Sequence, residues 1–437
     1  MMLLIYLPEF SARSEYVFNL IFKYESGIKY HVTTDLTEFQ NYSDEKINYS
    51  SSRIGNEFFI KSSSLLFEKE ITKQEFKVGQ KDQITILFPN NEDDLGFDIF
   101  SAVFYLVSRY EEYLPFTADE FGRFKAEDSL AFKNNFLHLP VVNIWIKIFQ
   151  EALQNKNPSL KIIPTSFETI LTYDIDVAYK YSGRSFGRTI GSVAKDLLSF
   201  NFKNFPERIQ NLSKSKKDVW DIYNNLKIAI LKNELKSVFF FLLSDKTRHD
   251  RNLNYENQAM RNLVNKIQGF SEIGIHPSFY SSIFPEKIVI EKERLENLSA
   301  KQITKSRQHY LKFILPDTYN SLFAAGITED YSMGFSKMPG FRAGTCKPFY
   351  FYDLKKEKAT GLKIFPITFM EGTLMNQLKP EDALQKVFEL LKEVKSVGGN
   401  FIPLWHNHTI SETKKYIAWK NVHDKMIQEI LFTLNAL

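Results

Sequence analysis

Two aspartates at the end of an apolar run are the residues of this sequence best placed to do chemistry. Asp174 and Asp176 close the stretch 171–176. Because residues i and i+2 of a strand point to the same side, the two carboxylates converge on one point as the strand leaves the core. One carboxylate can then bind a metal while the other handles a proton; the alternative is that both simply cap the following turn.

Histidines end two further apolar stretches. His276 follows the short strand predicted at 272–275, and His406 follows the one at 400–405. Imidazole and carboxylate together suit a divalent metal such as zinc. A single histidine is more often structural, but histidines at the ends of successive strands favour a functional site.

From residue 166 onward, the chain that must position these side chains alternates strands and helices. The predicted strands are 169–173, 237–243, 272–275, 361–367 and 400–405, and the predicted helices are 255–268, 285–298, 380–397 and 413–434. This alternation predicts an α/β fold with a mostly parallel sheet, open or closed into a barrel. In such folds the chemistry gathers at the C-terminal ends of the strands, where Asp174, His276 and His406 lie.

The first part of the chain has a different pattern. Short strands are predicted at 3–6 and 84–88, and helices at 97–114 and 141–153, before a connector at 155–164 that contains Pro158 and Pro164. We therefore expect two domains, a smaller α/β domain of unknown role at 1–165 and the alternating domain at 166–437.

Composition narrows the class of protein. The chain has 437 residues with 43% hydrophobic and 25% charged residues, which is typical of a globular protein, and its net charge of +4 is too small to indicate a nucleic-acid partner. The lysine-rich run at 214–217 is best interpreted as a solvated loop. The single cysteine, Cys346, excludes an internal disulfide. The N-terminal residues 1–9 predict a first strand rather than a signal peptide, and no apolar run reaches the roughly 18 residues of a membrane span, so we expect a cytoplasmic protein.

Three motifs in order along the chain resemble those of a known family. The segments 172–176 (Thr-Tyr-Asp-Ile-Asp), 272–276 (Glu-Ile-Gly-Ile-His) and 404–406 (Leu-Trp-His) resemble the motifs of the polysaccharide deacetylases, the NodB-homology group or carbohydrate esterase family 4. The resemblance covers residues 166 to 437. The residues at 276–278 (His-Pro-Ser) and 340–345 (Gly-Phe-Arg-Ala-Gly-Thr) resemble those of a branch of the family with an extra N-terminal domain. It implies a deformed (β/α) barrel that uses a divalent metal, zinc first among them, to remove acetyl from an N-acetylated saccharide.

The resemblance also implies residue roles. Asp174 matches the general base that takes a proton from a metal-bound water, and Asp176 and His276 match metal ligands. His406 matches the acid that protonates the leaving amine, and Arg307 matches an arginine that steadies the catalytic aspartate.

One departure from the family pattern concerns the third metal ligand. The family usually carries a second metal-binding histidine four residues after the first, and this chain has Tyr280 there. His309, His408 or a water are the possible replacements, and His309 is the predicted ligand. Tyr280 and His408 are expected to contact the substrate.

Arg342 is a further candidate for substrate binding. Gly340 and Gly344 flank it, so the backbone there can turn tightly. Its guanidinium can bind a carboxylate or phosphate of a substrate with two hydrogen bonds, or it can form an ion pair with an acid such as Asp330. Asp330 itself follows a predicted helix end and is expected at the site.

These predictions support a metal-dependent deacetylase as the leading hypothesis. The alternative is a catalytically silent deacetylase-like protein that binds glycans or takes part in polysaccharide assembly, which the tyrosine at position 280 suggests. A third possibility is hydrolysis of a non-sugar C–N bond on the same scaffold.

Overall fold

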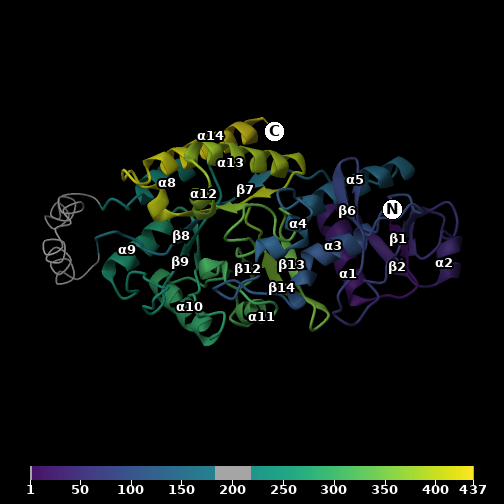
Figure 1. Cartoon of the computed structure of the whole chain (residues 1–437), viewed down its shortest axis with the longest axis horizontal. Coiled ribbons are helices and arrows are strands. Elements are labelled where there is room, and N and C mark those ends of the chain that lie inside the picture. The colour runs from purple at the N-terminus through teal and green to yellow at the C-terminus, as the bar shows by residue number, and fades with distance from the viewer. Residues whose placement is uncertain (1, 183–217, 437) are drawn as a thin grey trace.

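The computed structural model describes residues 2–182 and 218–436, and an N-terminal part and a C-terminal part lie side by side in it (Figure 1). The lysine-rich run at 214–217 lies outside the described residues. Both parts combine helices with mainly parallel strands, which confirms the mixed α/β prediction.

A four-stranded parallel sheet organises the N-terminal part, in the order β2-β1-β3-β4. Its strands are β1 (Leu3–Tyr6), β2 (Tyr30–Thr33), β3 (Lys46–Ser50) and β4 (Phe58–Lys61), and an antiparallel hairpin joins β5 (Val78–Lys81) to β6 (Ile84–Leu87). The helices here are α1 (Ala12–Phe18), α2 (Leu36–Asn41), α3 (Ile99–Val107), α4 (Leu130–Lys133) and α5 (Val141–Lys156).

The helix predicted over 97–114 is shorter in the structure. α3 ends at Val107, and a 3-10 turn at Tyr110–Tyr113 follows it. Arg109 breaks the helix with a left-handed backbone, φ 57°, and its buried guanidinium binds Glu111 at 2.9 Å and Glu112 at 2.8 Å. These ion pairs hold a conformation that few residues other than glycine adopt.

A nine-stranded sheet organises the C-terminal part, in the order β13-β14-β12-β11-β10-β9-β8-β17-β15. Its strands are β8 (Leu171–Ile175), β9 (Ser237–Phe241), β10 (Glu272–Ile275), β11 (Lys305–Ser306), β12 (Glu329–Asp330), β13 (Phe349–Asp353), β14 (Lys358–Ile364), β15 (Phe369–Met370) and β17 (Pro403–His406). β7 (Glu168–Thr169) and β16 (Asn400–Phe401) form a separate pair. All neighbours in the nine-stranded sheet are parallel except β13 and β14.

The parallel strands curve back on themselves. β14 pairs with β12 while β15 pairs with β17, and only the residues 365–368 separate β14 from β15 along the chain. Within this link Ile367 N donates to Met333 O at 3.0 Å and Thr368 N donates to Ile402 O at 2.9 Å. The C-terminal ends of β8, β10, β11 and β17 consequently face one shared space.

Helices cover the outside of this sheet. They are α8 (Tyr223–Lys232), α9 (Gln258–Ile267), α10 (Glu286–Ser299), α11 (Asp317–Ala324), α12 (Glu371–Gln377), α13 (Pro380–Ser396) and α14 (Ile417–Asn435). α13 and α14 pack together along one side in Figure 1, and α9, α10 and α11 lie along the opposite side. The four helices predicted from periodicity correspond to α9, α10, α13 and α14, with ends displaced by up to four residues.

Apolar side chains join the two parts. One buried cluster extends from Leu3 through Phe104 to Ile430, and a smaller cluster that includes Phe240, Tyr331 and Leu404 fills the inside of the curved sheet. None of the helices within residues 2–182 and 218–436 is long and apolar enough to cross a membrane.

Candidate metal and catalytic site

A cavity of about 560 Å³ opens at the C-terminal ends of the parallel strands. Asp174 and Asp176 reach it from β8, His276 from the end of β10, and His406 from β17. In the register of the sheet, His406 lies directly opposite Asp174. The convergence predicted from three separate strand ends is therefore what the structure shows.

Asp176, His276 and His309 form a cluster suited to a metal ion. One ligand atom from each lies within 4.8 Å of the other two. Asp176 Oδ1 is 3.2 Å from His276 Nε2, and Asp176 Oδ2 is 3.7 Å from His309 Nε2. Burial raises the pKa of Asp176, but the charges of His309 and His406 outweigh it and hold that pKa well below its usual value.

Unsatisfied atoms in this cluster match the needs of a cation. Asp176 Oδ1 and His276 Nε2 are buried and lack a hydrogen-bond partner among the described residues. His276 Nδ1 bonds the carbonyl oxygen of Arg307, so Nδ1 carries the hydrogen and the lone pair of Nε2 faces Asp176. An unpaired carboxylate oxygen beside an unpaired imidazole nitrogen is costly to bury unless a cation binds them. The residues present therefore fit a divalent metal.

A second carboxylate orients His309. Asp250 Oδ1 lies 2.9 Å from His309 Nδ1, and the same oxygen accepts the backbone N–H of Phe279 at 3.0 Å. This leaves His309 Nε2 pointing at Asp176, which is the usual arrangement behind a metal-binding histidine. Burial lowers the pKa of His309, but Asp176 and Asp250 raise it to about 9.

Arg307 fixes the first aspartate. Its Nη1 donates to Asp174 Oδ1 at 2.9 Å, its Nη2 to Thr172 Oγ1 at 2.8 Å and its Nε to the carbonyl of Tyr331 at 3.0 Å. Both Arg307 and Asp174 are buried, so this ion pair is hardly screened by water. Asp174 Oδ2 remains directed at the cluster, 3.6 Å from His276 Nε2.

His406 lies on the other side of Asp176 and has its own carboxylate. Its Nδ1 lies 2.8 Å from Glu371 Oε1, and its Nε2 lies 3.5 Å from Asp176 Oδ2. Glu371 begins α12, and its Oε1 also accepts from the backbone of His406 at 3.0 Å and from Thr409 Oγ1 at 3.0 Å. Burial lowers the pKa of His406, but Glu371 and Asp176 raise it to about 10.

Two predicted substrate contacts lie near the site but not on the cavity wall. The half-buried Tyr280 has its ring 5.9 Å from that of His249. His408 packs against Trp220 and Tyr416, and burial and the charge of His406 lower its pKa to about 4. Neither belongs to the cluster of Asp176, His276 and His309.

The structure places Arg342 and Asp330 away from the cavity. Arg342 is buried against Glu112, with Nη2–Oε2 and Nε–Oε1 distances of 2.6 and 2.9 Å, so its ion-pair partner is not Asp330. Gly340 and Gly344 do have positive φ, 126° and 66°. Asp330 is buried at the end of β12 and accepts hydrogen bonds from Ser306 and Ser332.

Asp250 and Glu371 are the carboxylates that contact Nδ1 of His309 and of His406. Each lies behind a histidine, and each belongs to a segment outside the three motifs. The available signal is weak: Asp250 follows β9 after a loop, and Glu371 directly follows the two-residue strand β15.

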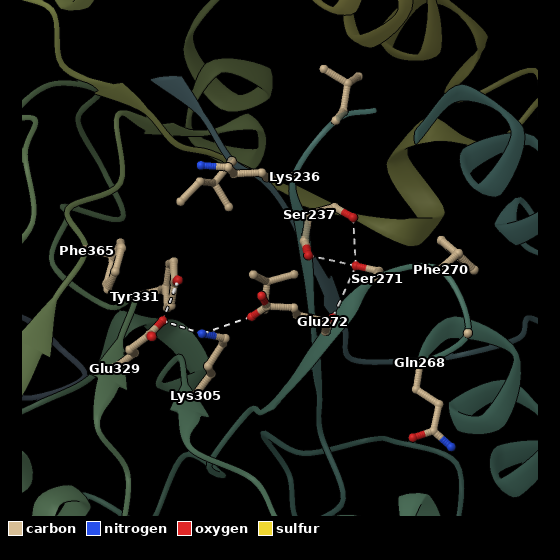
Figure 2. Close-up of a pocket in the computed structure, with 14 residues that line it drawn as sticks. Lys236, Ser237, Gln268, Phe270, Ser271, Glu272, Lys305, Glu329, Tyr331 and Phe365 are labelled. Carbon is tan, nitrogen blue, oxygen red and sulfur yellow. Dashed lines mark hydrogen bonds and ion pairs between the residues drawn. The ribbon is translucent and has the colours of Figure 1, made fainter. Parts of the chain in front are cut away.

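A second cavity, of about 470 Å³, lies at the opposite, N-terminal ends of β9 to β12 (Figure 2). Lys305 lies between Glu272 and Glu329 there, and Tyr331 donates to Glu329 at 2.9 Å. The other lysine of the wall, Lys236, pairs with Glu168 at 2.9 Å. Since both cations are paired and none of the lining residues is a histidine, this end of the sheet has the character of a structural ion-pair cluster.

One family model matches part of the chain. Residues 3–158 match a family described as "Family of unknown function (DUF7033)". No protein of curated function matches the sequence.

Similar solved structures include polysaccharide deacetylases, a carbohydrate esterase family 4 pseudoenzyme and a 4-alpha-glucanotransferase from Thermococcus litoralis. A protein assigned as a polysaccharide deacetylase from Mycobacterium smegmatis is 13% identical, with 63% of this chain and 92% of that chain covered and a TM-score of 0.39. A family 4 pseudoenzyme from Bacillus anthracis is 9% identical, with 61% and 63% covered and a TM-score of 0.33. The polysaccharide deacetylase Bc1974 from Bacillus cereus is 11% identical, with 60% and 88% covered and a TM-score of 0.29. At these values the roles of this chain's residues rest on their own geometry.

Proposed function

We propose that this protein is a metal-dependent hydrolase that removes acetyl from an N-acetylated saccharide. The observation that carries the proposal is the convergence, in one cavity, of an Asp/His/His cluster with two further groups suited to proton transfer, Asp174 and His406. The motifs at 172–176, 272–276 and 404–406 support the same reaction through their resemblance to polysaccharide deacetylases.

Asp176, His276 and His309 are the proposed metal ligands, and zinc is the proposed cation because two imidazoles and a carboxylate suit it. A divalent cation bound there lowers the pKa of water and polarises the amide carbonyl of the substrate. His276 is held in the required tautomer by the carbonyl of Arg307, and His309 by Asp250.

Asp174 is the proposed general base, and His406 is the proposed general acid. Arg307 keeps one oxygen of Asp174 occupied and leaves the other free to accept a proton from the attacking water. Glu371 fixes Nδ1 of His406, so Nε2 can give its proton to the leaving amine. Each positioned acid or base is worth about 10²–10⁴-fold in rate.

The proposed architecture is a deformed (β/α) barrel of the polysaccharide deacetylase type at 166–437, preceded by an α/β domain at 1–165. The continuous order of parallel strands from β15 to β14, with the short link between those two, supports the barrel. The N-terminal domain contributes to the cavity wall through Phe121 and Arg123.

Substitution of the proposed base tests this function. Asp174→Asn should reduce acetate release from N-acetylglucosamine oligomers by about 10²–10⁴-fold while zinc still binds, because Asp176 and both histidines remain. Asp245→Asn removes an exposed carboxylate that pairs with Arg294 and serves as the matched control. Full activity of Asp174→Asn would refute the assignment of the base.

The same measurements separate the alternatives. Stoichiometric zinc without acetate release from any saccharide would favour a catalytically silent glycan-binding protein. Release of acetate only from small non-sugar amides would identify a different C–N hydrolase. Loss of zinc binding in His309→Ala, with retention in Tyr280→Phe, would establish which residue completes the ligand set.

A further inference from the structure

The wall of the cavity beyond the proposed metal ligands is aromatic. Phe121, His249 and Tyr310 line it, with ring centroids 5.2 Å apart for Phe121 and Tyr310 and 5.6 Å apart for His249 and Tyr310. Phe121 comes from the N-terminal part of the chain, and Tyr310 directly follows His309. Flat rings of this kind bury the apolar face of a sugar without any demand for charge.

The position of this wall is fixed across the two parts of the chain. Arg123 Nη1 donates to the carbonyl of Tyr310 at 2.6 Å, and Asp119 holds the same guanidinium through Nε at 2.9 Å. Tyr310 has a left-handed backbone with φ 63°, which this hydrogen bond helps to maintain. The wall is thus a built feature rather than a chance grouping of rings.

Two arginines without carboxylate partners lie beside these rings. Arg248 and Arg251 line the same cavity, both are exposed, and neither forms an ion pair with a carboxylate of residues 2–182 or 218–436. Arg248 Nε donates to His249 Nε2 at 2.8 Å, which holds its side chain against the wall. The remaining cations of the cavity are already paired, Arg123 with Asp119 and Lys337 with Glu120.

The acids of the cavity do not cancel these two charges. Among the described residues, Asp174 and Asp176 are the only carboxylates that line it. Asp174 is paired with Arg307, and Asp176 faces His276, His309 and His406. The mouth of the cavity is therefore positively charged, and the negative charges of the two aspartates at its floor are already compensated by their neighbours. A positively charged cleft raises the local concentration of anionic ligands, and guanidinium groups bind carboxylate and phosphate with paired hydrogen bonds.

We propose that the substrate is an anionic N-acetylated saccharide, with a carboxylate or a phosphate that Arg248 and Arg251 bind. This inference rests on the function proposed above and narrows its substrate class. The acetamido group lies at Asp174 and Asp176, the sugar face lies on Phe121 and Tyr310, and the anion lies toward the two arginines. A cavity of about 560 Å³ suits one or two sugar units.

Binding to the full-length, zinc-loaded Asp174→Asn protein tests the proposal without turnover. Isothermal titration compares N-acetylglucosamine with N-acetylglucosamine 1-phosphate and with N-acetylmuramic acid, which carries a carboxylate. At least one anionic sugar should bind tenfold or more tightly than the neutral one, and whichever does so identifies the anion. This preference should decrease from 0.05 to 0.5 M salt.

Arginine substitutions complete the test. Arg248→Ala and Arg251→Ala should each reduce the preference several-fold and the double variant should abolish it, with little change for the neutral sugar. Arg261→Ala, an exposed arginine of α9, is the control and should leave the preference unchanged. Equal affinity for all three sugars, or a preference that survives the double substitution, would overturn the inference.

Hydrolysis by the unsubstituted protein distinguishes failure of this inference from failure of the proposed function. If the protein releases acetate from neutral oligomers and shows no preference for anionic saccharides, the deacetylase proposal is supported and the anion site is refuted. Tight, arginine-dependent binding of an anionic sugar without acetate release from any of the sugars sinks the deacetylase proposal and identifies an anionic-glycan-binding site.

Discussion

Replacement of Asp250 by asparagine tests how the third proposed ligand is held. Asp250 accepts hydrogen bonds from His309 Nδ1 at 2.9 Å, from Phe279 N at 3.0 Å and from Thr247 Oγ1 at 2.7 Å. Asparagine has nearly the same shape, and its amide oxygen still accepts from His309 and Phe279. The substitution therefore removes chiefly the negative charge behind the imidazole.

The expected effect on zinc affinity follows from the burial of this group. Loss of a carboxylate behind a metal-binding histidine typically costs about 10–100-fold in metal affinity, or about 1.4–2.7 kcal/mol. The side chain of Asp250 is 0% exposed, so water does not screen its charge and the upper part of that range applies. We expect the zinc Kd of Asp250→Asn to rise by about 50–100-fold.

Competition with a chromophoric chelator measures this Kd in the full-length protein. Asp245→Asn changes the net charge equally on the same loop, and its exposed side chain should leave the Kd unchanged. Circular dichroism establishes that both variants remain folded. An unaltered Kd for Asp250→Asn, in a protein whose zinc binding is lost in His276→Ala, would refute the role given to Asp250 and weaken that given to His309.

Three further predictions concern the stability of the folded protein and the loop that carries a proposed metal ligand. Burial raises the pKa of Glu291 from 4.5 to about 7, so the contribution of this side chain to the free energy of unfolding is complete below pH 4.5 and is lost as the pH rises through about 7. Between pH 5 and 9 the free energy of unfolding, measured with urea, should therefore fall by about 2.5 kcal/mol less in Glu291→Gln than in the unsubstituted protein. The same dependence on pH in both proteins would contradict this. Arg342→Met leaves Glu112 without one of its two buried arginine partners and should cost about 3–5 kcal/mol in the same denaturation assay, whereas a loss below about 1 kcal/mol would show that the ion pair is dispensable. Arg123→Ala releases the carbonyl of Tyr310 next to a proposed ligand and should weaken zinc binding by up to about tenfold, or about 1.4 kcal/mol; a zinc Kd within twofold of that of the unsubstituted protein would show that the loop holds its shape alone.

Local sequence was sufficient to predict a residue of the candidate site where that residue stands at the end of a strand. Asp174, Asp176, His276 and His406 each follow an apolar run, and the alternation of strands and helices implies that such ends meet at one edge of a parallel sheet. Helices such as α13 were predictable because their apolar faces repeat over several turns.

Contacts between segments that are distant in the sequence could not be predicted from local patterns. The pairings of Asp250 with His309 and of Glu371 with His406 depend on how loops fold over neighbouring strands, and no periodic pattern encodes them. The same holds for Arg342, whose partner Glu112 is 230 residues away. β11 and β12 have only two residues each, too few to show alternation.

The pairing of β8 with β17 also bears on when the site forms during synthesis. Asp174 and His406 are neighbours in register although they are 232 positions apart in sequence. Contacts of such long sequence separation form late, because the loop between the strands must first be closed. A nascent chain that has released residues 166–399 from the ribosome has both aspartates, His276 and His309 but no strand on the far side of β8. The chemistry proposed here can therefore begin only after β17 has been made and inserted beside β8, so a chain interrupted before that strand should be inactive even if it binds zinc.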